Sequence, residues 1–489
     1  MSAELLRILP ELVVAAGGLF FMVFPGLKSG RMMALLTIFF LTAAAKLSLL
    51  RLVNGPAAEP NFYGMVLQDR YASFFQVAIL ASMVLVLFGV IGYRKGGVQD
   101  RRELYALLLL VTVALMFLVS AQHLALIYIA LEMVSLLSYL LTGMLKRDSL
   151  SAEGGLKYFL FGSLATGTML YGISLIYGLT GCMDLSGLAA AFPKVMVLAP
   201  GLAGIALFLV LIGFAFKVAL VPFHMWAPDA YEGAPTPVTA FLAVLPKLAG
   251  FAVLARFLFV GITPGIILWP ILLGYLSVIT MTLANLAALV QTNVKRLLAY
   301  SSIAHAGTMT IGLAVATPMG LTAALYYLIA YLLMNMGAFL GVIAVGEMTG
   351  REDIGAFAGL SRRQPALAFM MTVALLSLSG IPPLAGFFGK MWVFGAAVKA
   401  GAVGLAVLGA VNSVISVFYY LKIVKAMYLD PEPAGASAGA KSTAVQLALV
   451  LCTVGVFLLG LCPGRVLLLA SDALPIPIQA GDLPWVTMR

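Results

Sequence analysis

Five ionisable side chains lie inside long apolar runs of this 489-residue chain. They are Glu132, Lys217, Lys247, His305 and Lys390. A charged group near the centre of a bilayer costs about 2.5 to 3.5 kcal/mol on insertion scales, so each group kept there needs a compensating role. We therefore take these five as the candidate catalytic residues of a buried proton pathway.

The lysines outnumber the single acid among these residues. One structural alternative is a static ion pair in which Glu132 neutralises one lysine while the others face water. One carboxylate cannot pair with three lysines, however, and both desolvation and neighbouring like charge favour the neutral amine. An amine that readily gains and loses a proton suits a relay. His305 also has a structural alternative, a hydrogen bond to Ser301 or Ser302 one turn earlier.

A proline closely follows the first buried lysine. Pro222 lies five residues after Lys217, has no N–H, and has a ring that crowds the carbonyl of Val218, so the helix should open there. In lipid, backbone groups freed in this way are tolerated only where protein or water satisfies them. We expect a broken helix and a hydrated pocket beside Lys217.

The same combination recurs later in the chain. Pro382 and Pro383 precede Lys390 within a glycine-rich stretch and predict a second broken helix. Pro246 stands directly before Lys247 and predicts a kink in that span. The alternative, that such prolines only shape helix packing, is common in membrane proteins.

Other charges lie within a turn or two of the end of an apolar run. For these we expect the side chain to extend to the membrane surface. This group consists of Lys46, Arg70, Lys157, Arg256, Lys422 and Lys425. We retain Lys157, together with His224 just after Pro222, as secondary site candidates.

The composition requires a membrane setting for these residues. The chain is 63% hydrophobic and only 10% charged, with a mean hydropathy of +1.09, whereas soluble domains are about 25% charged. Apolar runs of about 20 residues suit helices rather than barrel strands. Glu4 before the first run argues against a cleaved signal peptide, and the net charge of +10 is not gathered in a nucleic-acid-binding stripe. We predict an all-α integral membrane protein.

Polar and Gly/Pro punctuation divides the chain into fourteen expected spans. They are 5–25, 31–53, 66–93, 101–120, 122–145, 153–180, 200–221, 236–260, 265–290, 297–317, 321–346, 367–398, 402–428 and 442–463. Spans 4–8 and 9–13 each carry a proline-interrupted helix with a buried lysine in fourth place, which suggests two inverted five-helix repeats. The corresponding segments are 1–100 (three N-terminal helices), 101–260 and 261–430 (the two repeats), and 431–489 (linker, last span and tail).

Basic residues are distributed unevenly over the loops. Because basic loops stay in the cytoplasm, we expect the odd-numbered loops inside and both chain ends outside. Odd loops hold Lys28, Arg31, Arg94, Lys95, Arg101, Arg102, Lys146, Arg147, Lys295, Arg296, Arg351, Arg362, Arg363 and Lys441, whereas even loops hold little beyond Arg51, Arg70, Lys194 and Lys399.

The chain has no visible means of binding a redox cofactor or a metal. It shows no GxGxxG opening a helix after a strand and no P-loop. Its three cysteines, Cys182, Cys452 and Cys462, form no CxxC pair or Cys/His cluster. We expect any redox chemistry to belong to a partner protein.

Three long motifs resemble a known family. They are FKVALVPFHMWAPDAYEGAPTPVTAFLAVLPK (216–247), NVKRLLAYSSIAHAG (293–307) and SLSGIPPLAGFFGKMWVF (377–394). They are similar to the antiporter-like membrane subunits of respiratory complex I and of multi-subunit cation/proton antiporters. A lysine rather than a glutamate at 390, and the lack of a long C-terminal lateral helix, indicate one particular complex I subunit.

The resemblance implies a role for each candidate. By position, Glu132 matches the family's span 5 glutamate, Lys217 its partner on broken span 7, Lys247 the central lysine, His305 the connecting histidine and Lys390 the terminal residue of the outlet. The resemblance implies an ordinary helical residue before the central lysine, and this chain departs from that pattern with Pro246.

The expected function is proton translocation in a bacterial complex I of the cytoplasmic (inner) membrane. NADH, FMN, iron–sulfur clusters and quinone are expected in partner subunits, and the chain's neighbours would be another antiporter-like subunit, small helical subunits and lipid. One alternative is a subunit of a multi-subunit Na⁺/H⁺ antiporter, although sodium would favour more oxygen ligands than one carboxylate and three lysines offer. A second alternative is a non-pumping membrane scaffold.

Overall fold

The computed structural model describes residues 3–24, 26–27, 29–54, 60–432 and 442–476. Lys28 and Lys441 of the loop pattern, and most of the expected linker and tail, lie outside the described residues. Helices joined by short loops make up most of the described chain, and its one two-stranded sheet is a small hairpin in which β1 (Pro60–Asn61) pairs with β2 (Val66–Leu67). The predicted all-α membrane class is confirmed, and eleven of the helices are long and apolar enough to span a bilayer.

The helices follow the predicted spans closely in the first half of the chain. They are α1 (Ala3–Arg7), α2 (Leu9–Val23), α3 (Gly30–Asn54), α4 (Arg70–Gly92), α5 (Arg102–Ser120), α6 (Leu124–Thr142), α7 (Ser149–Thr180), α8 (Leu185–Leu198), α9 (Pro200–Val218), α10 (Trp226–Gly233) and α11 (Thr236–Arg256).

The second half continues in the same way. Its helices are α12 (Leu268–Leu289), α13 (Val294–Ala314), α14 (Pro318–Thr349), α15 (Leu360–Arg363), α16 (Pro365–Ser379), α17 (Ala385–Lys399), α18 (Val403–Tyr428), α19 (Thr443–Leu461) and α20 (Pro463–Asp472). Four of the helices lie outside the predicted spans. The short helices α8, α10 and α15 lie between spans, and α20 forms where only a polar tail was expected.

Polar residues define where several long helices begin. Asp69, Asp148, Asn293 and Thr317 each accept a hydrogen bond from a backbone N–H in the first turn of α4, α7, α13 and α14, respectively. Such caps satisfy donors that the helix itself leaves free. They explain why these helices start at the polar residues that separate the apolar runs of the sequence.

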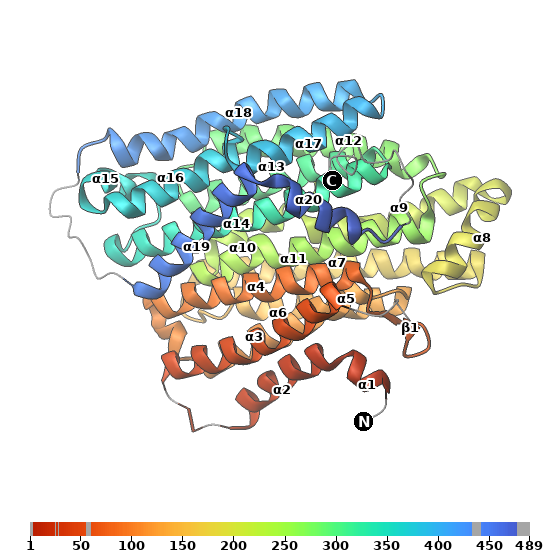
Figure 1. Cartoon of the computed structure of the whole chain (residues 1–489), viewed down its shortest axis with the longest axis horizontal. Helices are drawn as coiled ribbons and strands as arrows, with labels where there is room; N and C mark the ends of the chain where they lie inside the picture. The colour runs from red at the N-terminus through yellow and green to blue at the C-terminus, as the bar shows by residue number, and fades with distance from the viewer. Residues whose placement is uncertain (1–2, 25, 28, 55–59, 433–441, 477–489) are drawn as a thin grey trace.

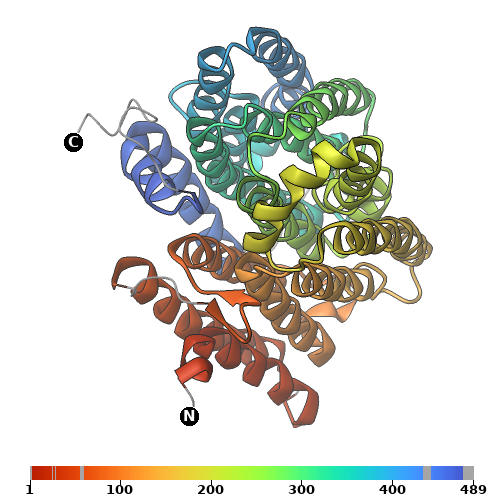
Figure 2. The same ribbon diagram turned by 90° about the vertical axis from the view of Figure 1, so that its right-hand side faces the viewer.

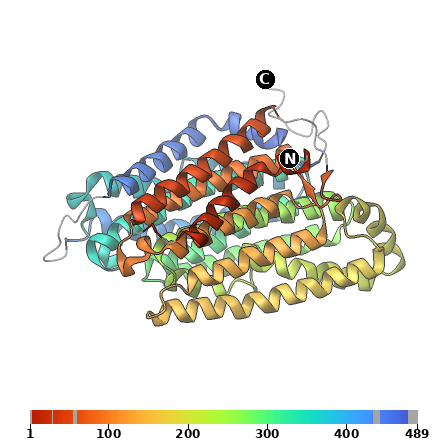
Figure 3. The same cartoon turned by 90° about the horizontal axis from the view of Figure 1, so that it is seen from below.

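The long helices run side by side as one bundle (Figure 1). The end-on view shows the red and orange N-terminal helices on one side and the green to blue helices on the other (Figure 2). From below, the red N-terminal helices lie in front of the rest (Figure 3). The central helix is α11, which packs against α4, α5, α9 and α14 and whose most apolar stretch is entirely buried.

The chain is interrupted at Pro222, as predicted. Helix α9 ends at Val218, Ala219 takes a left-handed conformation (φ 61°), and α10 begins only at Trp226. The indole N–H of Trp226 donates to the carbonyl oxygen of Phe216 at 3.3 Å, and the backbone N–H of Val221 donates to Thr280 Oγ1 at 3.0 Å. Side chains thus satisfy backbone groups that the break frees.

A second interruption separates α16 from α17. Helix α16 ends at Ser379, Gly380 is left-handed (φ 89°), and α17 begins after Pro382 and Pro383. Pro246, in contrast, lies inside α11, which continues from Thr236 to Arg256. The predicted disturbance at Pro246 therefore does not divide the helix.

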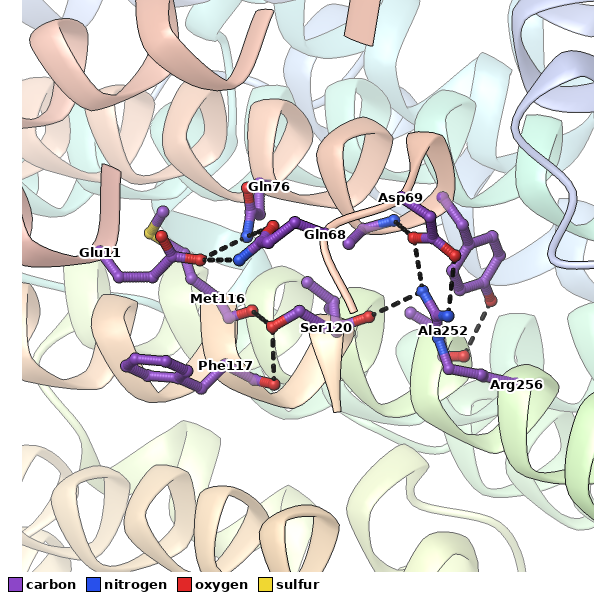
Figure 4. Close-up of polar contacts among 12 residues, drawn as sticks. Glu11, Gln68, Asp69, Gln76, Met116, Phe117, Ser120, Ala252 and Arg256 are labelled. Atoms are coloured by element: carbon purple, nitrogen blue, oxygen red, sulfur yellow. Dashed lines mark hydrogen bonds and ion pairs between the residues drawn. The ribbon is translucent and has the colours of Figure 1, made fainter. Parts of the chain in front are cut away.

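One prediction for an end-of-span charge is wrong. Arg256 does not extend to the membrane surface, because its side chain is only 1% exposed and makes a two-pronged ion pair with Asp69, both contacts at 2.8 Å (Figure 4). The guanidinium also donates to the Val119 carbonyl and lies over the ring of Tyr71. Arg256 stays buried because Asp69, at the start of α4, supplies a charge partner. The hydropathy of the sequence does not show that these two residues meet.

Candidate functional site

Lys217 is held by a serine on the helix that carries the candidate acid. Its side chain is buried, and its Nζ donates to Ser135 Oγ at 3.0 Å. Ser135 follows Glu132 by three residues on α6, so both lie on one helix face. Glu132 Oε2 is buried and, in the described part of the chain, has no hydrogen-bond partner. Lys217 therefore bonds to the residue that lies one turn after the acid on the same face of α6.

A glycine on α11 lets the start of the Lys217 side chain pack close to this helix. Gly250 lies three residues after Lys247, and a Cβ placed there would meet Val218 Cγ1 at 2.9 Å and Lys217 Cγ at 3.4 Å. The stem of Lys217 therefore packs against the helix turn next to Lys247. Helices α9 and α11 come together at this point.

Lys247 is buried and bonds to a single residue of α13. Its Nζ donates to the carbonyl oxygen of Ser302 at 2.7 Å and also to Ser302 Oγ. The hydroxyl of Tyr331, from α14, lies 2.8 Å from Ser302 Oγ. The central lysine is thus coupled to a hydroxyl pair rather than to a carboxylate.

His305 lies one turn beyond Ser302 and connects two tyrosines. Its Nδ1 is 2.7 Å from the hydroxyl of Tyr327, and its Nε2 is 2.9 Å from the hydroxyl of Tyr420. The structural alternative of a bond from His305 to Ser301 or Ser302 is wrong, because both ring nitrogens face tyrosines. An imidazole with a hydroxyl at each nitrogen can take a proton on one side and release it on the other.

Lys390 lies directly at the second helix break. Its Nζ donates to the carbonyl oxygens of Leu378 at 3.1 Å and Ser379 at 2.9 Å, which are free because α16 ends there. Helix α17 starts just beyond the prolines and carries the lysine back to these carbonyls. A small cavity lies between Lys390 and His305 and is also lined by Asn412, Ser416 and Tyr419.

The secondary candidates lie apart from this line. His224 is half-buried in the break after α9, and its Nδ1 has no partner within the described chain. Lys157 forms ion pairs with Glu153 at 2.6 Å and Asp229 at 2.7 Å, so it links α7 to the half-helix α10. Across the described residues, no three His, Cys, Asp or Glu side chains are grouped to hold a metal ion.

Comparison with known proteins places this arrangement in a family. Residues 121–416 match the family model for the membrane segment of NADH:quinone oxidoreductases and Mrp antiporters. The chain belongs to this family. The matched range includes all five candidate residues from Glu132 to Lys390.

Individual relatives extend the similarity over nearly the whole chain. NADH-quinone oxidoreductase subunit N 2 of Sorangium cellulosum is 40% identical over 482 residues, 93% of this chain and 95% of the relative. A chain of respiratory complex I from Thermus thermophilus is 35% identical, with a TM-score of 0.81, and the match covers 94% of this chain and 99% of that chain. A chain of the Mrp complex from a Dietzia species has a TM-score of 0.85 at 21% identity, with 97% of each chain covered, and shares the fold.

Several residues that complete the site could not be singled out from the sequence. The five charged candidates stand out because each interrupts an apolar run. Ser135, Tyr327, Tyr331 and Tyr420 do not, because their side chains are uncharged and this chain has 18 tyrosines, and Ser302 was considered only as a partner of His305. Only their spacing, one turn or less from a charged candidate on the same helix for the two serines, could have drawn attention to them.

Proposed function

We propose that this chain is the N subunit of a bacterial NADH:quinone oxidoreductase and that it moves protons across the inner membrane. Its high identity to proteins with that name supports the assignment. The observation that carries the transport proposal is the line of buried amines, hydroxyls and imidazole from Lys217 through Lys247 and His305 to Lys390. NADH, FMN, iron–sulfur clusters and quinone belong to partner subunits.

The cycle begins at the face of α6. Glu132 and Ser135 stabilise protonated Lys217, and a partner subunit that perturbs Glu132 makes this proton easier to lose. The proton passes to Lys247, then by way of Ser302 and His305 toward Lys390, which releases it to the outer side. Water would complete the segments between Lys217 and Lys247 and between His305 and Lys390, where the cavity lies.

The proposed topology has fourteen crossings. Adding α2, α13 and the α16–α17 pair to the eleven apolar helices gives this number. Segments 101–260 and 261–430 then form two inverted repeats, each with a broken helix, after the N-terminal segment 1–100 and before the last segment, 431–489. Both chain ends lie on the outer side.

The first test replaces Lys217 in the assembled complex. Lys217→Ala is expected to abolish coupled proton pumping while NADH oxidation and assembly persist, because the relay loses its entry amine. Lys422→Ala is the matched control, since Lys422 is an exposed lysine at the end of α18. Proton yield per NADH would be measured in closed vesicles, and a full yield in Lys217→Ala would refute the relay.

Partner identity separates the remaining alternatives. Co-purification with flavin- and iron–sulfur-bearing subunits is expected. Isolation with other membrane subunits alone would favour the Na⁺/H⁺ antiporter, whose fold this chain shares. Unchanged proton flux in all the lysine variants would favour a scaffold.

A further inference from the structure

Pro246 changes which carbonyls of α11 need a partner just before Lys247. Because proline has no N–H, the carbonyl of Leu242 has no backbone donor four residues on. The hydroxyl of Tyr231 takes its place at 3.1 Å. The neighbouring carbonyl, Ala243, accepts from the hydroxyl of Tyr331 at 3.0 Å. Two tyrosine hydroxyls thus donate hydrogen bonds to carbonyl oxygens in the helix turn that Pro246 disturbs.

Tyr331 has more neighbours than a single hydroxyl can satisfy as a donor. Its oxygen lies 3.0 Å from Ala243 O and 2.8 Å from Ser302 Oγ, and it accepts from Asn335 Nδ2 at 3.0 Å. A hydroxyl has one hydrogen and two lone pairs, so Tyr331 donates either to Ala243 or to Ser302. Ser302 is the residue that binds the Lys247 amine.

We propose that Tyr331 is a positioning residue whose hydroxyl switches direction with the protonation of Lys247. A charged lysine has no lone pair, so Ser302 accepts from it and turns its own hydrogen to Tyr331, which donates to Ala243. A neutral lysine can accept, so Ser302 turns its hydrogen to Nζ and Tyr331 donates to Ser302. Only the lysine proton leaves, and the two hydroxyl hydrogens rotate.

This arrangement keeps the central amine bonded in both states. Without Tyr331, Ser302 would lose the hydroxyl at 2.8 Å that accepts its hydrogen when Lys247 is charged and donates to it when Lys247 is neutral. The hydroxyl of Tyr231 also interacts with Ser302, but it already donates to Leu242 O and can only accept from the serine. Burial makes each unmade bond costly, since Ser302 and Lys247 are at most 2% exposed. The switch rests on the proposed function, because it requires Lys247 to gain and lose a proton.

The test compares two tyrosines of the same helix in the assembled complex. Tyr331→Phe removes the switch and should lower the initial rate of NADH-driven proton pumping by about tenfold. Tyr326→Phe is the matched control, because Tyr326 is also buried on α14 and donates to a carbonyl of a packed helix, Leu459 O at 2.7 Å. It should change the rate less than twofold.

A double substitution separates positioning from a merely structural role. If Tyr331 acts through Ser302, then Tyr331→Phe added to Ser302→Ala should cause no further loss, and Ser302→Thr, which keeps a hydroxyl, should recover pumping. Equal behaviour of Tyr331→Phe and Tyr326→Phe, or additive losses in the double variant, would overturn the switch.

Lys247→Ala distinguishes the two proposals. If it leaves proton yield intact, the relay itself is wrong. If it abolishes pumping while Tyr331→Phe does not differ from Tyr326→Phe, the relay stands and only the switch fails.

Discussion

The contact between Gly389 and Tyr327 sets the geometry of the outlet half of the site. A Cβ at Gly389 would lie 2.2 Å from Tyr327 Cδ2, so only glycine lets this ring pack on α17 beside Lys390. The same ring presents its hydroxyl to His305 Nδ1. The position of Tyr327, which bonds to the His305 imidazole, therefore depends on the absence of a side chain at Gly389.

Gly389→Ala is expected to displace Tyr327 and to reduce proton yield per NADH. A rigid ring cannot yield as a flexible chain would, and overpacking of this kind costs about 1–3 kcal/mol. Gly395→Ala on the same helix is the control, because a Cβ there meets nothing within 4 Å. Proton yield and thermal stability of the complex would be measured for both variants. Equal yields would contradict the role given to Tyr327.

The sequence was informative about charges and uninformative about their hydroxyl partners. Lys217, Lys247 and Lys390 were predictable because a charge in an apolar run needs a reason to be there. Ser302 and Tyr331 were not, since their role depends on which helices face one another. That pairing is a tertiary property which helix periodicity does not encode.

At the scale of helices, Asp69 both starts α4 and anchors α11. Its Oδ1 caps the backbone N–H of Ala72 at 2.7 Å, and its two oxygens bind Arg256 (Figure 4). To the left in the same view, the side-chain amides of Gln68 and Gln76 donate to Glu11 on α2. Polar contacts thus connect the N-terminal helices to the helix that carries Lys247.

Asp69→Asn is expected to destabilise the complex by about 3–5 kcal/mol, because it leaves the Arg256 guanidinium buried and unpaired. Asparagine still caps a helix well, so the loss would report the charge rather than the cap. The midpoint of thermal dissociation would be measured. Arg351→Ala is the control, since its pair with Asp353 is exposed and worth about 0–1 kcal/mol.

A second substitution sharpens this result. Adding Arg256→Met to Asp69→Asn should recover part of the stability, because an apolar side chain needs no charge partner. If the double variant is less stable than Asp69→Asn alone, the penalty of an unpaired charge is not the cause.

The positions of the long helices were predictable to within a few residues because apolar spans and prolines are local signals, whereas the short helices α8, α10, α15 and α20 were missed. The two breaks followed from Pro222, Pro382 and Pro383. Pro246 did not break α11, and the reason is again tertiary: Tyr231 and Tyr331, from other helices, take the carbonyls of that turn. A proline's local effect depends on whether neighbours replace the bond it removes.

For the whole molecule, the direction of proton release depends on which side of the membrane the odd-numbered loops face. The relay has an entry at Lys217 and an outlet at Lys390 only if the odd-numbered loops face the cytoplasm. The excess of basic residues in those loops, such as Arg147 after α6, favours this orientation. Ser186, at the start of α8, lies in an even-numbered loop.

Single cysteines at these two exposed positions would fix the orientation. In a chain whose own cysteines are replaced by alanine, Ser186→Cys should react with a membrane-impermeant maleimide in intact spheroplasts. Arg147→Cys should react only after the membrane is permeabilised, because its loop would lie in the cytoplasm. The reverse pattern would invert the proposed direction of proton release while leaving the line from Lys217 to Lys390 in place.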